Sequence, residues 1–184
     1  LGAGNAASFV WHDRGEPADQ TPLLQVRNLA LDRRIEDVSF DIRPGEIVGL
    51  AGLMGSGRTE IDETIFGRRS AAAGDVLLDG KPVRSQADAI DRGIALVPED
   101  RRKMGLVLDH SVRDNVLLPN LARFTRHFLV RDGEGLKTVT RTIRDLKIKT
   151  DGPDKLARLL SGGNQQKIVL GKWLARDPRL LILD

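Results

Sequence analysis

The sequence has no cysteine in its 184 residues. This absence excludes disulfide bonds and cysteine-ligated metal sites, and it is compatible with a reducing compartment. Long hydrophobic runs are missing too: no stretch reaches the roughly 18 apolar residues that a membrane-spanning helix needs. With 40% hydrophobic and 30% charged residues, the composition is instead that of a globular protein with a sizeable core.

The chain also has little net charge, because its 29 Lys and Arg nearly balance its 26 Asp and Glu and leave a formal net charge of only +3. This value is too small to indicate a nucleic-acid partner. The distribution is uneven, however: residues 99–160 hold 14 Lys and Arg against 9 Asp and Glu, and the rest of the chain holds 15 against 17. A solvated helical surface is the favoured interpretation, and attraction to an anionic membrane surface is the alternative.

The hydrophobic pattern predicts strands that alternate with helices. Short apolar or alternating runs predict strands at 23–26, 35–42, 47–51, 76–78, 94–97 and 180–184. The run at 47–51 is continuous, which is typical of a strand buried on both faces. Helical spacing and caps predict helices at 58–66, 85–92, 111–118 and 135–148, and another that starts at Ser161 and ends before Asp177-Pro178. The alternation favours an α/β fold with a largely parallel sheet.

The same pattern of strands and helices predicts the domain organisation. Residues 1–20 resemble a linker or tail, 21–98 the first part of a core, 99–160 a helical subdomain, and 161–184 a return to the core. The chain starts at Leu1 instead of methionine and stops just after an apolar run. We therefore expect it to be a piece of a longer protein.

A glycine-rich loop follows the predicted strand at 47–51. It fits the phosphate-binding pattern G-x-x-x-x-G-K-[ST] except at one position, where Arg58 replaces the lysine. In such a loop, backbone N–H groups and the N-terminus of the next helix face phosphate oxygens, and Thr59 would ligate Mg²⁺. Arg58 keeps the charge on a larger, planar group. The alternative is an ordinary strand-to-helix turn. The loop consists of Gly52, Leu53, Met54, Gly55, Ser56, Gly57, Arg58 and Thr59.

A second glycine-containing run, Leu-Ser-Gly-Gly-Asn-Gln-Gln-Lys at 160–167, resembles the signature motif of ATP-binding-cassette (ABC) ATPases, in the form found in bacterial sugar importers. Ser161 can cap the following helix, and Gly162 and Gly163 allow backbone N–H groups to approach a phosphate. The helix dipole also favours an anion at this end. A plain capped helix start is the simpler alternative. The resemblance implies a P-loop NTPase-type ABC cassette with an antiparallel β region, a mostly parallel core sheet and a helical subdomain.

The resemblance also implies roles for two carboxylates. Residues 180–184 are similar to the Walker B strand, whose terminal Asp184 would orient Mg²⁺ through water. Glu99 stands where the family places a glutamine that senses the γ-phosphate and contacts the permease. A carboxylate there would repel the phosphate unless a cation compensates. Glu99 is otherwise a surface residue at a strand end.

Other family positions have no clear counterpart. The family stacks adenine on an aromatic residue before the phosphate loop, but residues 21–37 contain none. Phe9 or Trp11 could substitute, although each fits better as part of the linker. The three histidines lie upstream of the family's histidine switch and are interpreted as structural or surface residues: His12, His110 and His127.

Arg58 and the acidic 98–100 segment resemble the second cassette of two-cassette monosaccharide importers. That resemblance implies ATP and Mg²⁺ as ligands and a location at the cytoplasmic face of the bacterial inner membrane. The implied partners are a first cassette in the same full-length chain, membrane permease subunits and, indirectly, a periplasmic sugar-binding protein. The chain's own site would be degenerate and its signature intact, and the isolated chain would be weakly active or inactive.

Three rival interpretations remain at this point. The first is a regulatory or dimerisation module that binds nucleotide without hydrolysing it. The second is a DNA-repair or chromosome-type ABC ATPase, but residues 99–160 are too few for its long coiled coil. The third is a small P-loop kinase, against which the signature run argues.

Overall fold

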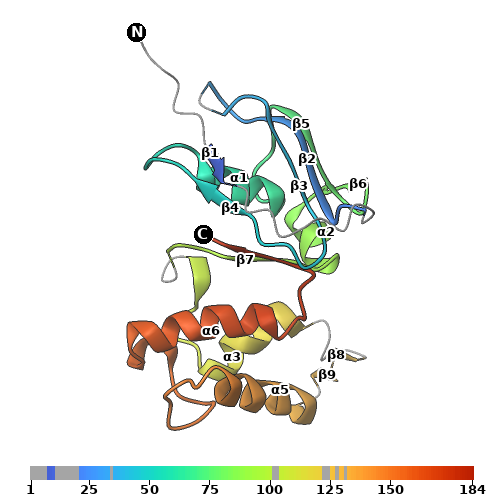
Figure 1. Cartoon of the computed structure of the whole chain (residues 1–184). Helices are drawn as coiled ribbons and strands as arrows, with labels where there is room; N and C mark the ends of the chain where they lie inside the picture. The colour runs from blue at the N-terminus through green and yellow to red at the C-terminus, as the bar shows by residue number, and fades with distance from the viewer. Residues whose placement is uncertain are drawn as a thin grey trace. The chain divides into compact units, whose positions relative to one another are not determined.

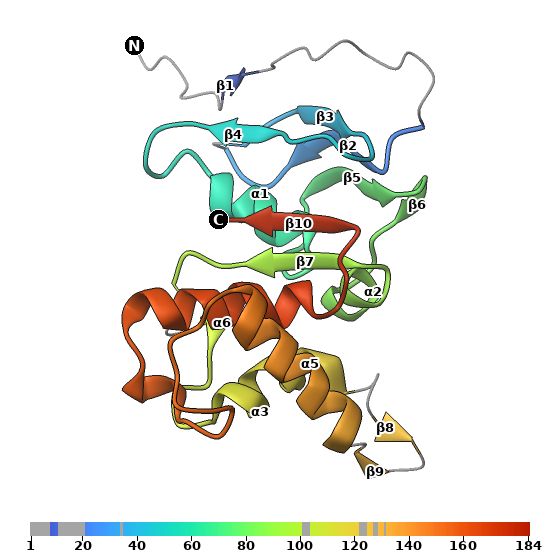
Figure 2. The same ribbon diagram turned by 60° about the horizontal axis from the view of Figure 1, so that its bottom comes forward.

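The computed structural model describes residues 8–10, 21–33, 35–100, 104–121, 125–126, 129–130 and 132–184. The chain forms two compact units, Leu1–Arg92 and Gly93–Asp184. Figures 1 and 2 show the elements of both units. In the part of the chain that the structure describes, no helix is long and apolar enough to cross a membrane.

The first unit is built on an antiparallel sheet with the strand order β3-β2-β5-β6. The strands of this sheet are β2 (Leu24–Ala30), β3 (Val38–Ile42), β5 (Ala73–Leu78) and β6 (Lys81–Pro82). Leu24 and Val26 of β2 are fully buried, and Val26 pairs with Phe40 of β3. The expected antiparallel region is therefore confirmed, and alternate residues of β2 form its core.

Two short helices complete this unit, and both begin where local chemistry predicts. Helix α1 (Arg58–Ile65) ends at Phe66, and Gly67 follows with a φ of 70°. Such a left-handed residue commonly terminates a helix. Helix α2 (Gln86–Asp91) is capped by Ser85, whose hydroxyl accepts a hydrogen bond from the Asp88 N–H.

The strand before the glycine-rich loop differs from the prediction. Strand β4 spans only Gly49–Ala51 and pairs antiparallel with β1 (Ser8–Val10), which lies inside the predicted linker. Ile47, expected to be buried, is 97% exposed. The prediction of a strand buried on both faces was wrong, because β4 pairs only with β1 among the strands that the structure describes. A short apolar run does not reveal its pairing partner.

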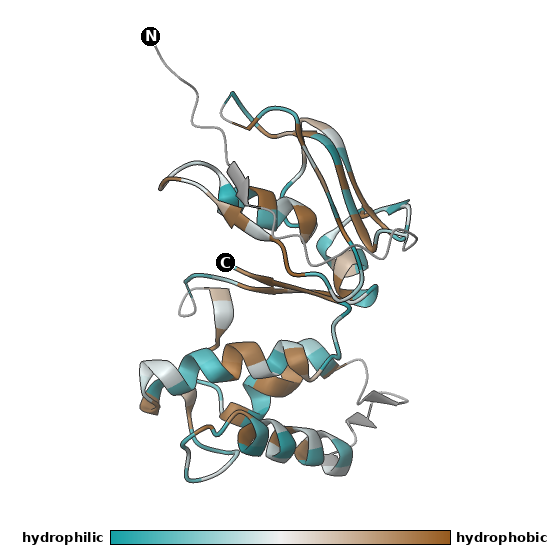
Figure 3. Ribbon diagram, in the orientation of Figure 1, coloured by the Kyte–Doolittle hydropathy of each residue, from teal (hydrophilic) through white to brown (hydrophobic). Residues whose placement is uncertain are grey.

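The second unit combines a parallel strand pair with a group of helices. Strands β7 (Ile94–Val97) and β10 (Leu180–Leu183) pair in parallel, and both are strongly apolar (Figure 3). The helices are α3 (Val112–Leu117), η2 (Leu118–Asn120), α5 (Asp132–Asp145), η3 (Ala157–Leu159) and α6 (Gly162–Leu174), and β8 (Thr125–Arg126) pairs with β9 (Leu129–Val130). Figure 2 shows α3, α5 and α6 on one side of the β7–β10 pair. Antiparallel and parallel sheets together with helices confirm the α/β class.

The helices of this unit pack through small and apolar residues. Val112, Val116, Val139 and Ile168 are fully buried between α3, α5 and α6. At Gly171 of α6, a side-chain Cβ would lie 2.4 Å from Thr142 Cγ2 of α5. Real Cβ atoms do not approach that closely, so the distance between α5 and α6 depends on this glycine.

Ser111 caps α3 as predicted. Its hydroxyl accepts a hydrogen bond from the Asp114 N–H, and the Asp114 carboxylate accepts one from the Ser111 N–H, which makes a capping box. The buried Asn115 side chain then fixes the preceding turn, because its Nδ2 donates to the carbonyls of Val107 and Ser111 and its Oδ1 accepts from the Val107 N–H.

Candidate functional site

The glycine-rich loop runs from β4 into α1 within the first unit. Gly55 and Gly57 have φ angles of 80° and 96°, in the left-handed region that favours glycine. At Gly57 the space is closed as well: an added Cβ would lie 2.1 Å from Cδ1 of the buried Ile35. The fold therefore requires glycine at position 57, which is the N-cap of α1.

Ser56 is the residue of this loop that most clearly indicates a ligand site. It is only 7% exposed, yet its hydroxyl has no hydrogen-bond partner among the described residues. A buried polar atom without a partner costs free energy unless a ligand or water satisfies it. Leu53 and Met54, by contrast, are 67% and 98% exposed, so the loop is open to solvent on that side. The loop thus fits an anionic group that accepts hydrogen bonds, such as a phosphate.

Arg58 is the first residue of α1 and is exposed. It forms no hydrogen bond or ion pair with any residue that the structure describes, so no described carboxylate neutralises its guanidinium charge. The next residue, Thr59, is half-buried at the same helix start. An unneutralised cation beside a helix N-terminus strengthens the attraction for an anion at this loop.

The signature run begins α6 in the second unit, but not with the predicted cap. Ser161 is the N-cap residue, yet its hydroxyl makes no hydrogen bond to a backbone N–H. It accepts one from Asn164 Nδ2 at 3.0 Å instead. The predicted capping bond was wrong: the Ser161 hydroxyl accepts from the Asn164 side chain instead of a backbone N–H of α6. The leading N–H groups of the helix therefore lack this internal acceptor.

Gly162 and Gly163 follow at the open end of α6. Gly163 is exposed, and an added Cβ at this position would meet no atom within 4 Å. The fold therefore does not need glycine at 163. A ligand that must approach the backbone closely would need it.

Two residues of the signature run hold the helix start in place, and the sequence analysis gave neither a role. Asn164 Oδ1 accepts a hydrogen bond from the Lys149 N–H at 2.9 Å. Gln165 is 3% exposed, and its Nε2 donates to the carbonyls of Ala157 and Leu160 at 3.1 and 3.2 Å. Polar residues in the buried positions of a helix were the signal that could have identified them.

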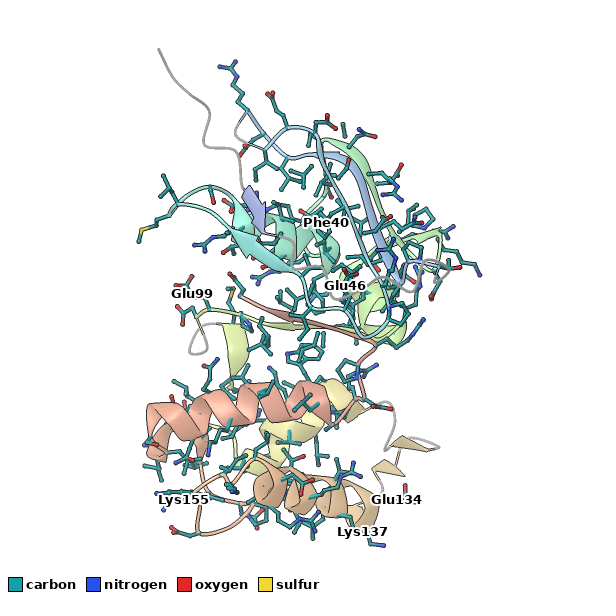
Figure 4. All side chains as sticks on the ribbon, viewed as in Figure 1. Phe40, Glu46, Glu99, Glu134, Lys137 and Lys155 are labelled. Atoms are coloured by element: carbon teal, nitrogen blue, oxygen red, sulfur yellow. The ribbon has the colours of Figure 1, made fainter. Side chains whose placement is uncertain are left out.

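The parallel strand pair brings two predicted residues to one edge. Leu183 of β10 is in register with Val97 of β7, and the Asp184 N–H donates to the Val97 carbonyl at 3.0 Å. Glu99, two residues beyond Val97, is exposed at the end of β7 (Figure 4). Ligands of α/β proteins bind outside the carboxyl ends of parallel strands, which is where Asp184 and Glu99 lie.

The structure does not test the predicted Mg²⁺ ligands or most of the aromatic and histidine assignments. Thr59 and Asp184, the predicted Mg²⁺ residues, belong to different units, and each is described within its own unit. Among the described residues, no cluster of three His, Asp or Glu side chains could hold a metal by itself. Trp11, His12 and His127 lie outside the described residues, as does the side chain of Phe9, whereas His110 is exposed in a turn.

Comparison with known proteins decides the family. Residues 35–184 match the family described as ABC transporter. The chain belongs to the ABC transporter family. Its sequence is 48% identical over 163 residues to a ribose import ATP-binding protein (RbsA) of Geobacillus kaustophilus, a match that covers 88% of this chain and 33% of the relative. It is 47% identical over 174 residues to a putative ribose/galactose/methyl galactoside import ATP-binding protein of Rhizobium etli, with 91% and 33% covered.

This ABC transporter chain therefore spans about a third of the length of these curated relatives. A solved structure of cbiO1 from Clostridium perfringens, part of the ABC transporter complex cbiONQ, has the same fold, with a TM-score of 0.67 at 21% identity. The similarity covers 90% of this chain and 66% of that one. The expected fold of an ABC cassette is confirmed.

Proposed function

We propose that the chain is an ATP-binding cassette of a bacterial sugar importer, which couples ATP binding and hydrolysis to carbohydrate uptake through a membrane permease. The main support for this proposal is the signature run at the start of α6. An added Cβ at Gly163 would meet no atom within 4 Å, so the fold gives no reason for glycine there and a closely approaching ligand does. The names of the relatives, which are ribose and ribose/galactose import ATP-binding proteins, support a sugar as the transported compound. Such a cassette would work at the cytoplasmic face of the inner membrane.

In this proposal the chain is the second of two cassettes, and each ATP lies between the phosphate loop of one cassette and the signature of the other. Ser161, Gly162 and Gly163 would place hydroxyl and N–H donors around the γ-phosphate held by the first cassette. Donors fixed in advance stabilise the charge that develops during phosphoryl transfer. The 99–160 region, beginning at Glu99, would contact the permease, and a periplasmic binding protein would deliver the sugar on the other side.

The chain's own loop would hold the second ATP. The loop's N–H groups and the Ser56 hydroxyl would bind phosphate oxygens, and Arg58 would supply positive charge. Thr59 and Asp184 would hold Mg²⁺, which neutralises phosphate charge when bound. Since the planar guanidinium of Arg58 does not reproduce the compact lysine ammonium, we propose that this second site binds ATP but hydrolyses it poorly.

The test compares the two sites in the complete transporter in membrane vesicles. Ser161→Ala should lower sugar-stimulated ATP hydrolysis by about a hundredfold, the usual cost of one transition-state donor. Arg58→Ala should lower it by less than about threefold, and Arg68→Ala, which breaks a partly exposed ion pair with Glu63 away from the loop glycines, should leave it unchanged. Asn164→Ala keeps the Ser161 hydroxyl and removes its Asn164 contact, together with the bond that Asn164 accepts from the Lys149 N–H. Equal losses from Ser161→Ala and Arg58→Ala would refute the unequal sites.

Arg58 also supports a second candidate, a regulatory or dimerisation module that binds nucleotide without turnover. Under this alternative, a fluorescent ATP analogue binds the 184-residue chain, and neither Ser161→Ala nor Arg58→Ala changes ATP hydrolysis by the complete transporter. For the isolated chain we expect weak binding and little turnover in either case, because each composite site needs residues of a partner cassette.

A further inference from the structure

Lys172 lies in the second half of α6, nine positions after Gly163, and the proposed function gives it no role. It is half-buried, and its Nζ donates a hydrogen bond to the carbonyl of Gly105. The same Nζ lies 5.6 Å from the ring centroid of the neighbouring Trp173, within the range of a cation–π contact. These contacts point the ammonium into the unit instead of toward water.

No carboxylate of the described residues balances this charge, because Lys172 forms no ion pair with any of them. Burial alone lowers the pKa of Lys172 from 10.5 to about 8. At neutral pH the folded chain must therefore carry a poorly solvated cation, which reduces its stability. An apolar side chain of similar length would fill the same space without that cost.

The acceptor of this hydrogen bond belongs to the segment that leaves β7. Gly105 is buried and lies six residues beyond Glu99, and the Met104 N–H bonds the Asp100 carbonyl in the same segment. Lys172 thus joins the helix that starts at the signature to the described residues 104–106 beyond Glu99. The two meet inside one compact unit.

Other contacts attach the same half of α6 to the end of α3. The buried Asn120 side chain donates to the Lys172 carbonyl at 2.9 Å and to the Val116 carbonyl at 2.8 Å. Arg176 donates to the Pro119 carbonyl. These contacts attach η2 to α6 and do not involve Gly105. The bond from Lys172 therefore has a separate effect, which is to attach Gly105 to a helix whose position is already fixed.

We infer that Lys172 is a positioning residue: its bond to the Gly105 carbonyl fixes residues 104–106, which follow Glu99 in the chain, to the signature helix, so that these residues and the helix move together during the ATPase cycle. This inference rests on the proposed function for the cycle itself. An apolar residue would pack in the same space but would lack the donor to the Gly105 carbonyl, so this bond is what the buried ammonium adds.

The experiment measures activity and stability in parallel. In the complete transporter, Lys172→Met should lower kcat for ATP by about tenfold and leave KM within about twofold, because it misplaces groups without removing any that contact nucleotide. Lys172→Arg keeps a donor and should retain more activity than Lys172→Met. Lys155→Met removes a half-buried ammonium whose described partner is Asp151 (Figure 4) and should change neither value.

Stability separates positioning from a purely structural role. The Tm of the 184-residue chain should rise by about 2–4 °C in Lys172→Met, in the opposite direction to activity. A lower Tm, or an unchanged kcat, overturns the inference. If the wild-type transporter hydrolyses no ATP, the proposed function fails, and hydrogen exchange of the 184-residue chain decides the inference. Exchange at residues 104–106 should then be at least about tenfold faster in Lys172→Met, and equal exchange overturns the inference.

Discussion

The phosphate loop and the signature run are both glycine-containing segments that begin a helix, but the chain shapes them by different means. The phosphate loop depends on backbone conformation, since Gly57 has a positive φ and lies against Ile35. The signature run depends on side chains, because Asn164 and Gln165 bind the surrounding backbone while Gly163 is unconstrained. Glycine at position 57 is therefore required by the fold as well as by the proposed phosphate site, whereas glycine at position 163 is required only by the proposed function.

The largest expected effect tests the backbone side of this comparison. Gly57→Ala should lower the free energy of unfolding by about 3 kcal/mol, through left-handed strain and the clash with Ile35. Urea denaturation of the 184-residue chain measures it. Gly55→Ala is the matched control, because its φ is 80° but an added Cβ meets nothing within 4 Å. Only the strain, about 1 kcal/mol, should appear there. Equal losses at both positions would show that Ile35 does not close the site.

The next effect, in order of size, concerns pH and belongs to the signature helix. Because the pKa of Lys172 is lowered to about 8 in the folded chain and is near 10.5 when unfolded, the unfolded chain binds more protons between these values. The free energy of unfolding should therefore rise as pH increases from 8 to 10.5, by about 2 kcal/mol after allowance for partial solvent exposure. Urea denaturation at both pH values should show this rise in the wild type and lack it in Lys172→Met. A rise of the same size in the variant would assign it to other groups.

A smaller effect tests the side-chain half of the comparison. Gln165→Leu should cost about 1 kcal/mol in chemical denaturation. It removes the bonds to the Ala157 and Leu160 carbonyls but also removes the buried Gln165 Oε1, which has no partner among the described residues. Gln166→Leu, at a neighbouring position whose side chain bonds no described residue, should change stability less. If Gln166→Leu costs more, side-chain bonding at 165 does not shape this segment.

The smallest expected change in stability is at Gly163. Gly163→Ala should alter the free energy of unfolding by less than about 0.5 kcal/mol, since space is open and alanine favours helix. ATP hydrolysis by the complete transporter should nevertheless fall strongly, because the added methyl group would lie where a phosphate approaches. Gly171→Ala, facing Thr142, is the reverse case and should destabilise the chain. Full activity in Gly163→Ala would remove the functional reason for that glycine.

The sequence predicted those features whose causes are local. Ser85, Ser111 and Gly67 begin or end helices through bonds and backbone angles within a few residues, so their patterns are visible in the chain itself. The pairing of β4 was not predictable, because it depends on β1, a segment some forty positions away. The ABC signature was recognisable from its residues, but the bond from Asn164 to Ser161 was not, since a local side-chain bond and a backbone capping bond are both compatible with the same sequence.

Two glycines of helix α6 should respond differently when the sequence accumulates mutations under selection. The helix contains one glycine that its neighbours require, Gly171, and another that they do not, Gly163. A population selected only to accumulate folded protein would keep the first and soon lose the second. A population selected to grow on the transported compound would keep both. A library of random variants of α6, selected once for folded protein and once for growth, would therefore show which glycine is conserved for packing and which is conserved for ligand binding.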